Sequence, residues 1–285
     1  MNLPFKIDLT GKTAVVTGGG GVLCSGFSKA LAACGAKVAV CDLRKEAAQK
    51  VVDEIVADGG TALAVEANVL SKDSLIAAKA LIDEKLGSCD ILLNGAGGNN
   101  PRGTTSKEYL EPEDLDKAAD DVKTFFDLDP DGISFVFNLN FLGTLLPTQV
   151  FAGDMAKKKG TCILNVSSMN AFRPLTKIPA YSGAKAAVSN LTEWLAVHFA
   201  KVGIRVNAIA PGFFLTEQNR TLLTNPDGSL TARSAKILAA TPMGRFGETD
   251  DLVGALLFLV DEKAAAFVNG IVLPIDGGFS AYSGV

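Results

Sequence analysis

The first β-rich run of the chain ends in a block of four glycines, and this junction restricts the fold more than any other feature. Residues 12–17 read Lys-Thr-Ala-Val-Val-Thr, Gly18 to Gly21 follow them, and the residues from Val22 onward suit a helix. A strand, a glycine turn and a helix in this order bring backbone N–H groups and a helix N-terminus against a pyrophosphate. A glycine run alone is more often a plain tight turn, so this interpretation depends on the rest of the chain.

Strand-like and helix-like segments alternate over all 285 residues, which is typical of an α/β fold. The hydrophobic content of 48% suits a parallel sheet, whose strands are buried on both faces. No linker rich in proline, serine or glycine divides the chain, and no internal repeat is visible. We therefore expect one domain that covers residues 1–285.

Two side chains with acid–base chemistry stand four residues apart, at Tyr181 and Lys185. On a helix this spacing places both side chains on one face, one turn apart. A lysine cation nearby favours the phenolate, and should lower the tyrosine pKa from its ordinary value of about 10 toward the working range. Ser168 precedes the pair, at the end of an apolar run that reads as a buried strand. Without Ser168 and the glycine turn elsewhere in the chain, the pair would be better interpreted as a tyrosine and a lysine on the surface of a helix.

The glycine turn, Ser168 and the Tyr181–Lys185 pair together resemble the pattern of the short-chain dehydrogenase/reductase family. In that family an asparagine lies on the helix before the serine-bearing strand, and here the matching residue is Asn140. The resemblance covers nearly the whole chain. It implies an oxidoreductase with a Rossmann-type, doubly wound, mostly parallel seven-stranded sheet that carries helices on both faces.

The resemblance also implies that Asn140, Ser168, Tyr181 and Lys185 are the catalytic residues. Tyr181 would transfer the proton, while Ser168 would hydrogen-bond the substrate oxygen. Lys185 would lower the Tyr181 pKa and bind the nicotinamide ribose, and Asn140 would hold a water that links Lys185 to solvent. The implied reaction is hydride exchange between the nicotinamide and a carbinol carbon.

The glycine motif departs from the family pattern Thr-Gly-x-x-x-Gly-x-Gly, because Val22 and Cys24 stand at the second and third glycine positions. Either Gly20 and Gly21 allow the backbone to approach the pyrophosphate closely, or the helix begins at a slightly different residue. A milder departure is Gly95, which follows Asn94 where the family usually has Asn-Asn-Ala-Gly.

The cofactor implied is NAD(H), and NADP(H) is the less favoured alternative. The second strand ends at Asp42, whose carboxylate can accept hydrogen bonds from ribose hydroxyls and would repel a 2′-phosphate. Arg44 follows closely and keeps NADP(H) open. The implied cofactor contacts are Gly18, Gly20, Gly21, Val22, Leu23, Asp42, Asn68, Val69, Asn94, Gly95, Ala96, Tyr181, Lys185, Pro211, Gly212, Phe214 and Thr216.

Two long polar segments border the expected site. One is an acidic insertion at about 98–132, and the other, at about 213–240, reads as a substrate lid. A solvated acidic flap is the alternative interpretation of the insertion. The insertion imitates the start of a calcium loop, but Asn138 stands where a bidentate glutamate is needed, so no metal is expected. The candidate substrate contacts are Asn99, Asn100, Arg102, Asn170, Arg173 and Arg220.

These segments offer arginines, asparagines and threonines rather than long apolar walls, which favours a polyol or sugar acid over a steroid or acyl chain. The chain also looks similar to the sugar-acid reductases of the family, and the expected substrate pair is D-mannonate and D-fructuronate. Gluconate 5-dehydrogenase and 3-oxoacyl reductase activities are alternatives. A non-catalytic NAD-binding regulator is a remote one.

No basic stripe predicts nucleic-acid binding, and the apolar runs are far too short to span a membrane. The N-terminus leaves no room for a signal peptide, and the five cysteines suggest a reducing compartment, so we expect a cytoplasmic protein. His198, the only histidine, lies on the helix expected from Pro179 to about residue 202. The resemblance implies a homotetramer or homodimer, in which this helix commonly forms the interface.

Overall fold

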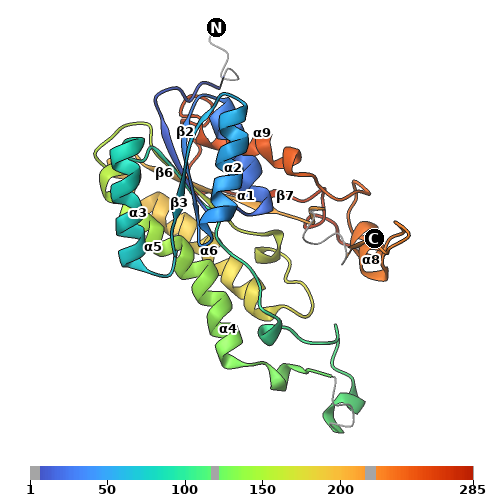
Figure 1. Cartoon of the computed structure of the whole chain (residues 1–285). Coiled ribbons are helices and arrows are strands. Elements are labelled where there is room, and N and C mark those ends of the chain that lie inside the picture. Colours follow the sequence, from blue (N-terminus) through green and yellow to red (C-terminus); the bar gives the residue numbers. More distant parts are fainter. Residues whose placement is uncertain (1–6, 117–121, 216–222, 285) are drawn as a thin grey trace.

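Seven strands form one parallel sheet at the centre of the computed structural model, which describes residues 7–116, 122–215 and 223–284 (Figure 1). The strand order is β3-β2-β1-β4-β5-β6-β7, and every neighbouring pair is parallel. This confirms the predicted Rossmann-type sheet. The strands are β1 Thr13–Thr17, β2 Lys37–Asp42, β3 Thr61–Glu66, β4 Ile91–Asn94, β5 Cys162–Val166, β6 Arg205–Pro211 and β7 Val272–Ile275.

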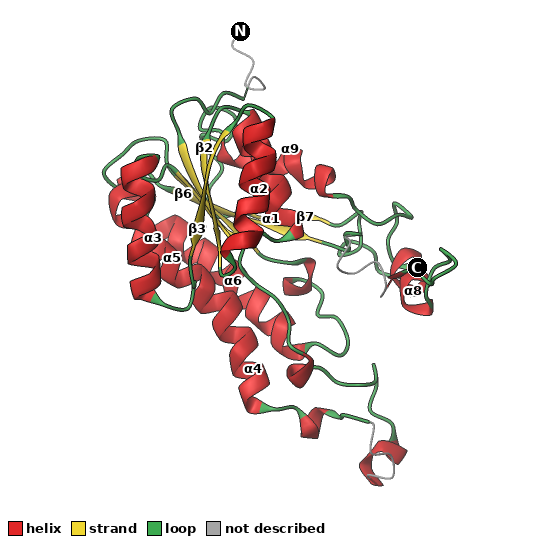
Figure 2. Cartoon of the chain, in the orientation of Figure 1, coloured by secondary structure: helices red, strands yellow, loops and turns green. Residues whose placement is uncertain are grey.

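Helices cover both faces of the sheet (Figure 2). On one face, α1 Val22–Ala33, α2 Lys45–Ala57 and α9 Thr249–Val260 contribute to one hydrophobic core. On the other face, α3 Lys72–Lys85, α5 Gly143–Met155 and α6 Pro179–His198 contribute to a second core. Successive residues of β1 serve both cores, since Val16 belongs to the first and Val15 to the second.

The strand order changes direction between β1 and β4. Strands β2 and β3 extend the sheet on one side of β1, whereas β5, β6 and β7 extend it on the other side of β4. In open α/β sheets, ligands bind at the carboxyl ends of the strands at such a switch point, because the loops there diverge. The exits of β1, β4 and β5 are therefore where a site is expected.

One continuous helix runs from Pro130 to Met155 and is built from α4 Pro130–Phe137, a π-helical turn Asn138–Leu142, and α5. It begins at Pro130, because Asp129 caps its N-terminus and proline suits the first turn of a helix. By length and composition alone this helix could cross a membrane. It packs against α3 and α6, as the core helix of a globular domain does.

Two segments lie beside the sheet edge. The described part of residues 98–132 extends away from the sheet (Figure 1) and contains short 3-10 turns. Within residues 213–240 lies α8 Ala232–Ala239. Lys236 of α8 pairs with Glu108 of the first segment at 3.0 Å. The roles of these segments as a functional insertion and a substrate lid stay predictions.

Candidate active site

The sheet edge brings together the four residues at which the family resemblance pointed. Ser168 follows β5 and caps a 3-10 turn, Met169–Ala171. Tyr181 and Lys185 lie on the first turns of α6, and Asn140 lies in the π-helical turn before α5. Such π-helical turns are rare and frequently occur at functional sites. Ser168, Lys185 and Asn140 are buried, and Tyr181 is half-buried.

The Lys185 ammonium lies beside the Tyr181 ring, with Nζ 5.6 Å from the ring centroid. Its hydrogen-bond partner is the backbone carbonyl oxygen of Val166 at the end of β5, at 2.8 Å. The Tyr181 hydroxyl instead interacts with the Ser168 side chain. Ser168 Oγ also accepts a hydrogen bond from the Asn170 backbone N–H at 3.2 Å. The strand end thus orients both the serine and the lysine around the phenol.

Asn140 is held rigidly and faces the same space as Lys185. Its amide nitrogen donates to the carbonyl oxygens of Gly98 and Val136, and its Oδ1 accepts from the Gly98 N–H. A Cβ at Gly97 would lie 2.6 Å from Asn140 Oδ1 and 3.1 Å from Lys185 Nζ. Only glycine therefore fits between the chain after β4 and these two polar groups.

The electrostatics differ from the sequence-based expectation that Lys185 lowers the Tyr181 pKa. Burial raises the pKa of Tyr181 above its ordinary value, and the hydrogen bond with Ser168 only partly opposes this. Burial also lowers the pKa of Lys185 to about 8. The two shifts share one cause, because removal from water disfavours both charged forms. The expected direction of the Tyr181 pKa shift is therefore wrong.

A buried polar network ties the strands that end at the site to the helices beside them. The Asn94 amide nitrogen donates to Thr148 Oγ1 of α5 at 3.0 Å and to Asn165 Oδ1 of β5 at 2.9 Å. Asn165 in turn donates to Thr192 Oγ1 of α6 at 2.9 Å. This network fixes α5 and α6 against β4 and β5, and sequence analysis did not foresee it.

The glycine block forms a tight turn that ends in the N-terminus of α1. Gly18 has a φ of +65°, a conformation that side chains rarely adopt. A Cβ on Gly19 or Gly20 would lie 2.7 Å from Val40 or Ala47, so the turn packs closely on β2 and α2. The helix starts at Val22, directly after the N-cap Gly21. The valine at the second glycine position is therefore already a helical residue and does not belong to the turn.

Cys24 replaces the third glycine of the family pattern, and the structure explains why. Its buried side chain points at the exit of β4, into the space that a Cβ on Gly95 would need. Burial raises the pKa of the Cys24 thiol to about 12, so the group is neutral and serves packing.

The acid at the end of β2 lies beside the glycine turn. Asp42 Oδ2 accepts a hydrogen bond from the Gly20 N–H at 3.1 Å, and Oδ1 accepts from the Arg44 N–H at 3.0 Å. Each carboxylate oxygen can accept further hydrogen bonds. Past β3, Asn68 is exposed and caps its own turn through Leu70, and Val69 packs against Gly143 of α5.

These features fit a dinucleotide. The N-terminus of α1 has no side-chain cap and no acidic residue in its first turn, so its N–H groups are open to an anion. Asp42 provides acceptors at the end of β2. Thr17 Oγ1 accepts hydrogen bonds from the Gly95 and Ala96 N–H groups and so fixes the chain after β4. The donor set therefore suits phosphates at α1 and ribose hydroxyls at Asp42. Leu23, on the first turn of α1, is half-buried.

The segment after β6 closes the other side of the site. A Cβ on Gly212 would lie 2.6 Å from Asp276, so the chain after Pro211 passes directly against the end of β7. Phe214 is buried and pairs with Gly247 in an isolated bridge. Thr216, expected to contact the cofactor, lies outside the described residues.

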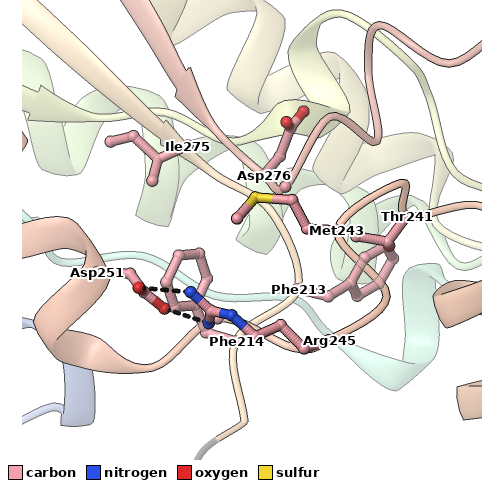
Figure 3. A pocket seen from close by; sticks show the side chains of 10 residues that line it. Phe213, Phe214, Thr241, Met243, Arg245, Asp251, Ile275 and Asp276 are labelled. Atoms are coloured by element: carbon pink, nitrogen blue, oxygen red, sulfur yellow. Dashed lines mark hydrogen bonds and ion pairs between the residues drawn. The ribbon is translucent and has the colours of Figure 1, made fainter.

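Figure 3 shows the cavity next to this segment, with a volume of about 210 Å³. Phe213 and Phe214 line it from different sides, Phe213 next to Thr241 and Phe214 next to Asp251. Arg245 faces inward but forms two hydrogen bonds with the Asp251 carboxylate, at 2.6 and 2.8 Å. Its charge is therefore neutralised within the protein, and it braces the N-terminus of α9.

The candidate substrate contacts differ in burial and in the partners that they already have. Asn170 is buried directly after Ser168, whereas Arg173 is exposed on the loop that follows. The Arg102 guanidinium pairs with Asp129 and Asp131, and the Arg102 backbone N–H donates to Asn100 Oδ1 at 2.9 Å. Asn99 bonds Thr104 Oγ1 at 3.1 Å. The three insertion residues thus build the insertion itself. Arg220 lies outside the described residues.

Comparison with known proteins agrees with this arrangement. The sequence pattern of the family described as short chain dehydrogenase matches residues 12–227. The chain is 59% identical over 285 residues to an uncharacterized oxidoreductase of Haemophilus influenzae, covering 100% of this chain and 99% of that protein. It is 53% identical over 283 residues to the uncharacterized oxidoreductase UxuB of Bacillus subtilis, covering 99% of this chain and 100% of that protein.

A solved structure is similar over the full length. It is a crystal structure with bound NAD of a provisionally named D-mannonate oxidoreductase from Haemophilus influenza. The two chains are 58% identical, the TM-score is 0.94, and the match covers 100% of each.

Proposed function

Because the chain belongs to the short-chain dehydrogenase family, and is therefore an oxidoreductase that acts on alcohol and ketone groups, we propose that it interconverts D-mannonate and D-fructuronate with NAD(H). The observation that carries the substrate proposal is the full-length likeness, at 58% identity, to the provisionally named D-mannonate oxidoreductase. The polar character of the segments beside the site supports an acidic, hydroxylated substrate.

We assign the proton transfer to Tyr181. In the reductive direction its O–H donates to the carbonyl oxygen of the substrate, which suits a phenol whose pKa is raised by burial. Ser168 hydrogen-bonds the same oxygen and the phenol, so it orients the two for transfer. The bound nicotinamide supplies or accepts the hydride.

Lys185 and Asn140 support this step. The Lys185 ammonium, anchored on Val166, provides positive charge next to the phenol when the proton leaves. Asn140 opens its helix at the π-helical turn and faces the space beside Gly97, through which a water could reconnect Lys185 with solvent. Because Gly97 is exposed, this route leads outward.

We propose NAD(H) rather than NADP(H). The Asp42 carboxylate lies within hydrogen-bond distance of the glycine turn, so a 2′-phosphate on the adenosine ribose would meet a negative charge. The NAD in the Haemophilus influenza structure supports the same choice. Arg44, the residue that could favour NADP(H), is exposed.

NADH oxidation with a panel of keto acids tests the proposal. The panel contains D-fructuronate, 5-keto-D-gluconate and an acetoacetyl thioester, and we expect D-fructuronate to give the highest kcat/KM. Tyr181→Phe should abolish turnover while NADH still binds, as measured by fluorescence. Turnover of the thioester alone would contradict the substrate proposal, and an active Tyr181→Phe variant would contradict the proposed mechanism.

We further propose a cytoplasmic homo-oligomer. On α6, the Trp194 side chain is 57% exposed and stacks on His198 at 4.5 Å between ring centroids, next to Val197, which is 80% exposed. Such an apolar surface suits a subunit contact. Light scattering should show a dimer or tetramer for the wild type and smaller species for Trp194→Glu. The five free thiols suit a reducing compartment.

A further inference from the structure

A second cavity, of about 240 Å³, lies between the insertion, the loop before α6 and helix α8. It is separate from the cavity of Figure 3, although Phe213 lies at the border of both. Its wall contains two aromatic rings, Phe213 and Phe279, which contact each other edge-on at 5.2 Å between centroids. Its charged lining residues are Glu108, Lys177, Arg233 and Lys236.

Positive charge exceeds negative charge in this cavity. Lys236 forms an ion pair with Glu108, and within the part of the chain that the structure describes, Lys177 and Arg233 form none. Both act on Glu108, whose pKa is lowered first by the hydrogen bond from Lys236 and then by the charges of Lys236, Lys177 and Arg233. The Glu108 carboxylate thus already lies in the field of three cations, and two of these form no ion pair with any residue that the structure describes.

The cavity is tied to the catalytic residues by short chain connections. Lys177 stands directly before α6, which carries Tyr181. Its backbone has a φ of +72°, unusual for a residue with a side chain, and its carbonyl oxygen accepts a hydrogen bond from the Thr105 N–H at 2.9 Å. Phe213 follows Gly212 at the end of β6. The insertion therefore holds the Lys177 backbone in a constrained conformation shortly before α6.

We infer that Lys177, Arg233 and Lys236 form a subsite for the carboxylate of the substrate, with Phe213 and Phe279 as its apolar wall. This inference rests on the proposed function and names the part of the site that would distinguish a sugar acid from a neutral polyol. The carboxylate of a six-carbon acid is several bonds away from the reacting carbon. It therefore needs a cationic partner away from Tyr181, and this cavity provides one.

Other cations near the site are less suitable. Arg102 is bound to Asp129 and Asp131, and Arg245 is bound to Asp251. Glu108 has a defined place in the subsite, because it competes with the substrate carboxylate for Lys236. Its removal should therefore tighten substrate binding, whereas removal of Lys177 or Arg233 should weaken it.

Binding without turnover provides the first test. Tyr181→Phe loaded with NADH is titrated by calorimetry with D-mannonate and with D-mannitol, its neutral analogue. We expect D-mannonate to bind more tightly, and we expect Arg233→Gln in the same background to reduce its affinity by about tenfold, as loss of one charge-assisted contact would. Equal affinity for the acid and the polyol would overturn the inference whether or not the enzyme turns over either compound.

Charge-altering variants provide the second test. With the preferred keto acid, Arg233→Gln and Lys177→Gln should raise KM by about tenfold with kcat little changed, and Glu108→Gln should lower KM. The control is Lys201→Gln, at an exposed position beyond the far end of α6. An unchanged KM in both cationic variants would overturn the inference while D-fructuronate turnover left the proposed function intact. If D-fructuronate is not turned over but D-mannonate binding still depends on these charges, the proposed function would be overturned and the carboxylate subsite would stand.

Discussion

The sulfur of Cys24 on α1 occupies the space into which a side chain on Gly95 would project. Both residues depart from the family pattern, Cys24 after β1 and Gly95 after β4, the two strands at which the strand order changes direction. The two departures therefore form one packing unit, in which a larger residue on α1 requires a glycine after β4. Thr17 completes the contact, because its Oγ1 accepts from the Gly95 N–H at 3.1 Å.

Gly95→Ala should destabilise the protein strongly, because its Cβ would overlap the Cys24 sulfur in a fully packed core. In a Cys24→Gly background the same substitution should cost less, although the Thr17 carbonyl oxygen, 2.9 Å from the added Cβ, keeps part of the strain. Urea unfolding of the wild type, both single variants and the double variant gives the coupling free energy. We expect a coupling of about 1–3 kcal/mol. Additive effects would show that the two positions are independent.

The buried Lys185 should make stability depend on pH. The unfolded chain keeps the lysine proton up to its ordinary pKa of 10.5, whereas the folded chain releases it near 8. Between these values the unfolded state binds more protons at this residue, so Lys185 contributes an increase with pH to the free energy of unfolding. The buried cysteines, whose pKa values are raised by burial, contribute a decrease over the upper part of this range. Over the whole range between the two pKa values, the contribution of Lys185 to the free energy of unfolding rises by about 3 kcal/mol.

Lys185→Met removes this titration, so the slope of the free energy of unfolding against pH should be lower in the variant than in the wild type. Urea unfolding without nucleotide, between about pH 7 and about pH 9.5, measures it while Tyr181 stays protonated, since burial raises the pKa of that phenol. Lys201→Met, at an exposed position, is the matched control. A wild type and a Lys185→Met variant with the same pH slope would contradict the shifted pKa.

Much of this fold follows from the sequence, because its signals are local. The β1 strand, the glycine turn and the pair Tyr181 and Lys185 are each recognisable within a few residues. The helix expected to begin at Pro179 also begins there in the structure. Such segments depend on apolar periodicity and glycine positions, and the parallel sheet follows from their alternation.

The parts that sequence analysis missed depend on contacts between distant segments. Gly95, the partner of Cys24, lies three strands further along the chain, and the direction of the Tyr181 pKa shift depends on how much protein covers the phenol. Lys177 and Arg233 carry no motif, and they line one cavity only because the loop before α6 approaches α8. Arg102 looked available in the sequence, but Asp129, which binds it, lies across the insertion.

The network through Asn165 and Thr192 should matter for stability more than for chemistry. Thr192→Val keeps the side-chain volume but removes the oxygen that accepts from Asn165 and the hydroxyl that donates to the Val188 carbonyl oxygen. It leaves a buried amide N–H without a partner, which costs about 1–3 kcal/mol. Thermal unfolding measures the loss, and Thr61→Val at the exposed start of β3 is the control. A kcat that falls tenfold or more in a folded Thr192→Val enzyme would show that the network also positions Lys185.

Asp42 should control the choice of cofactor through its charge. Asp42→Asn keeps the shape and an acceptor for the Gly20 N–H, but it removes the negative charge that opposes a 2′-phosphate. The ratio of kcat/KM with NADH to that with NADPH should therefore fall by roughly tenfold or more, mainly because NADPH improves. Asp53→Asn on α2, an exposed acid, changes the net charge equally and is the control. If both variants shift the ratio alike, the discrimination comes from the overall field and not from the carboxylate at the end of β2.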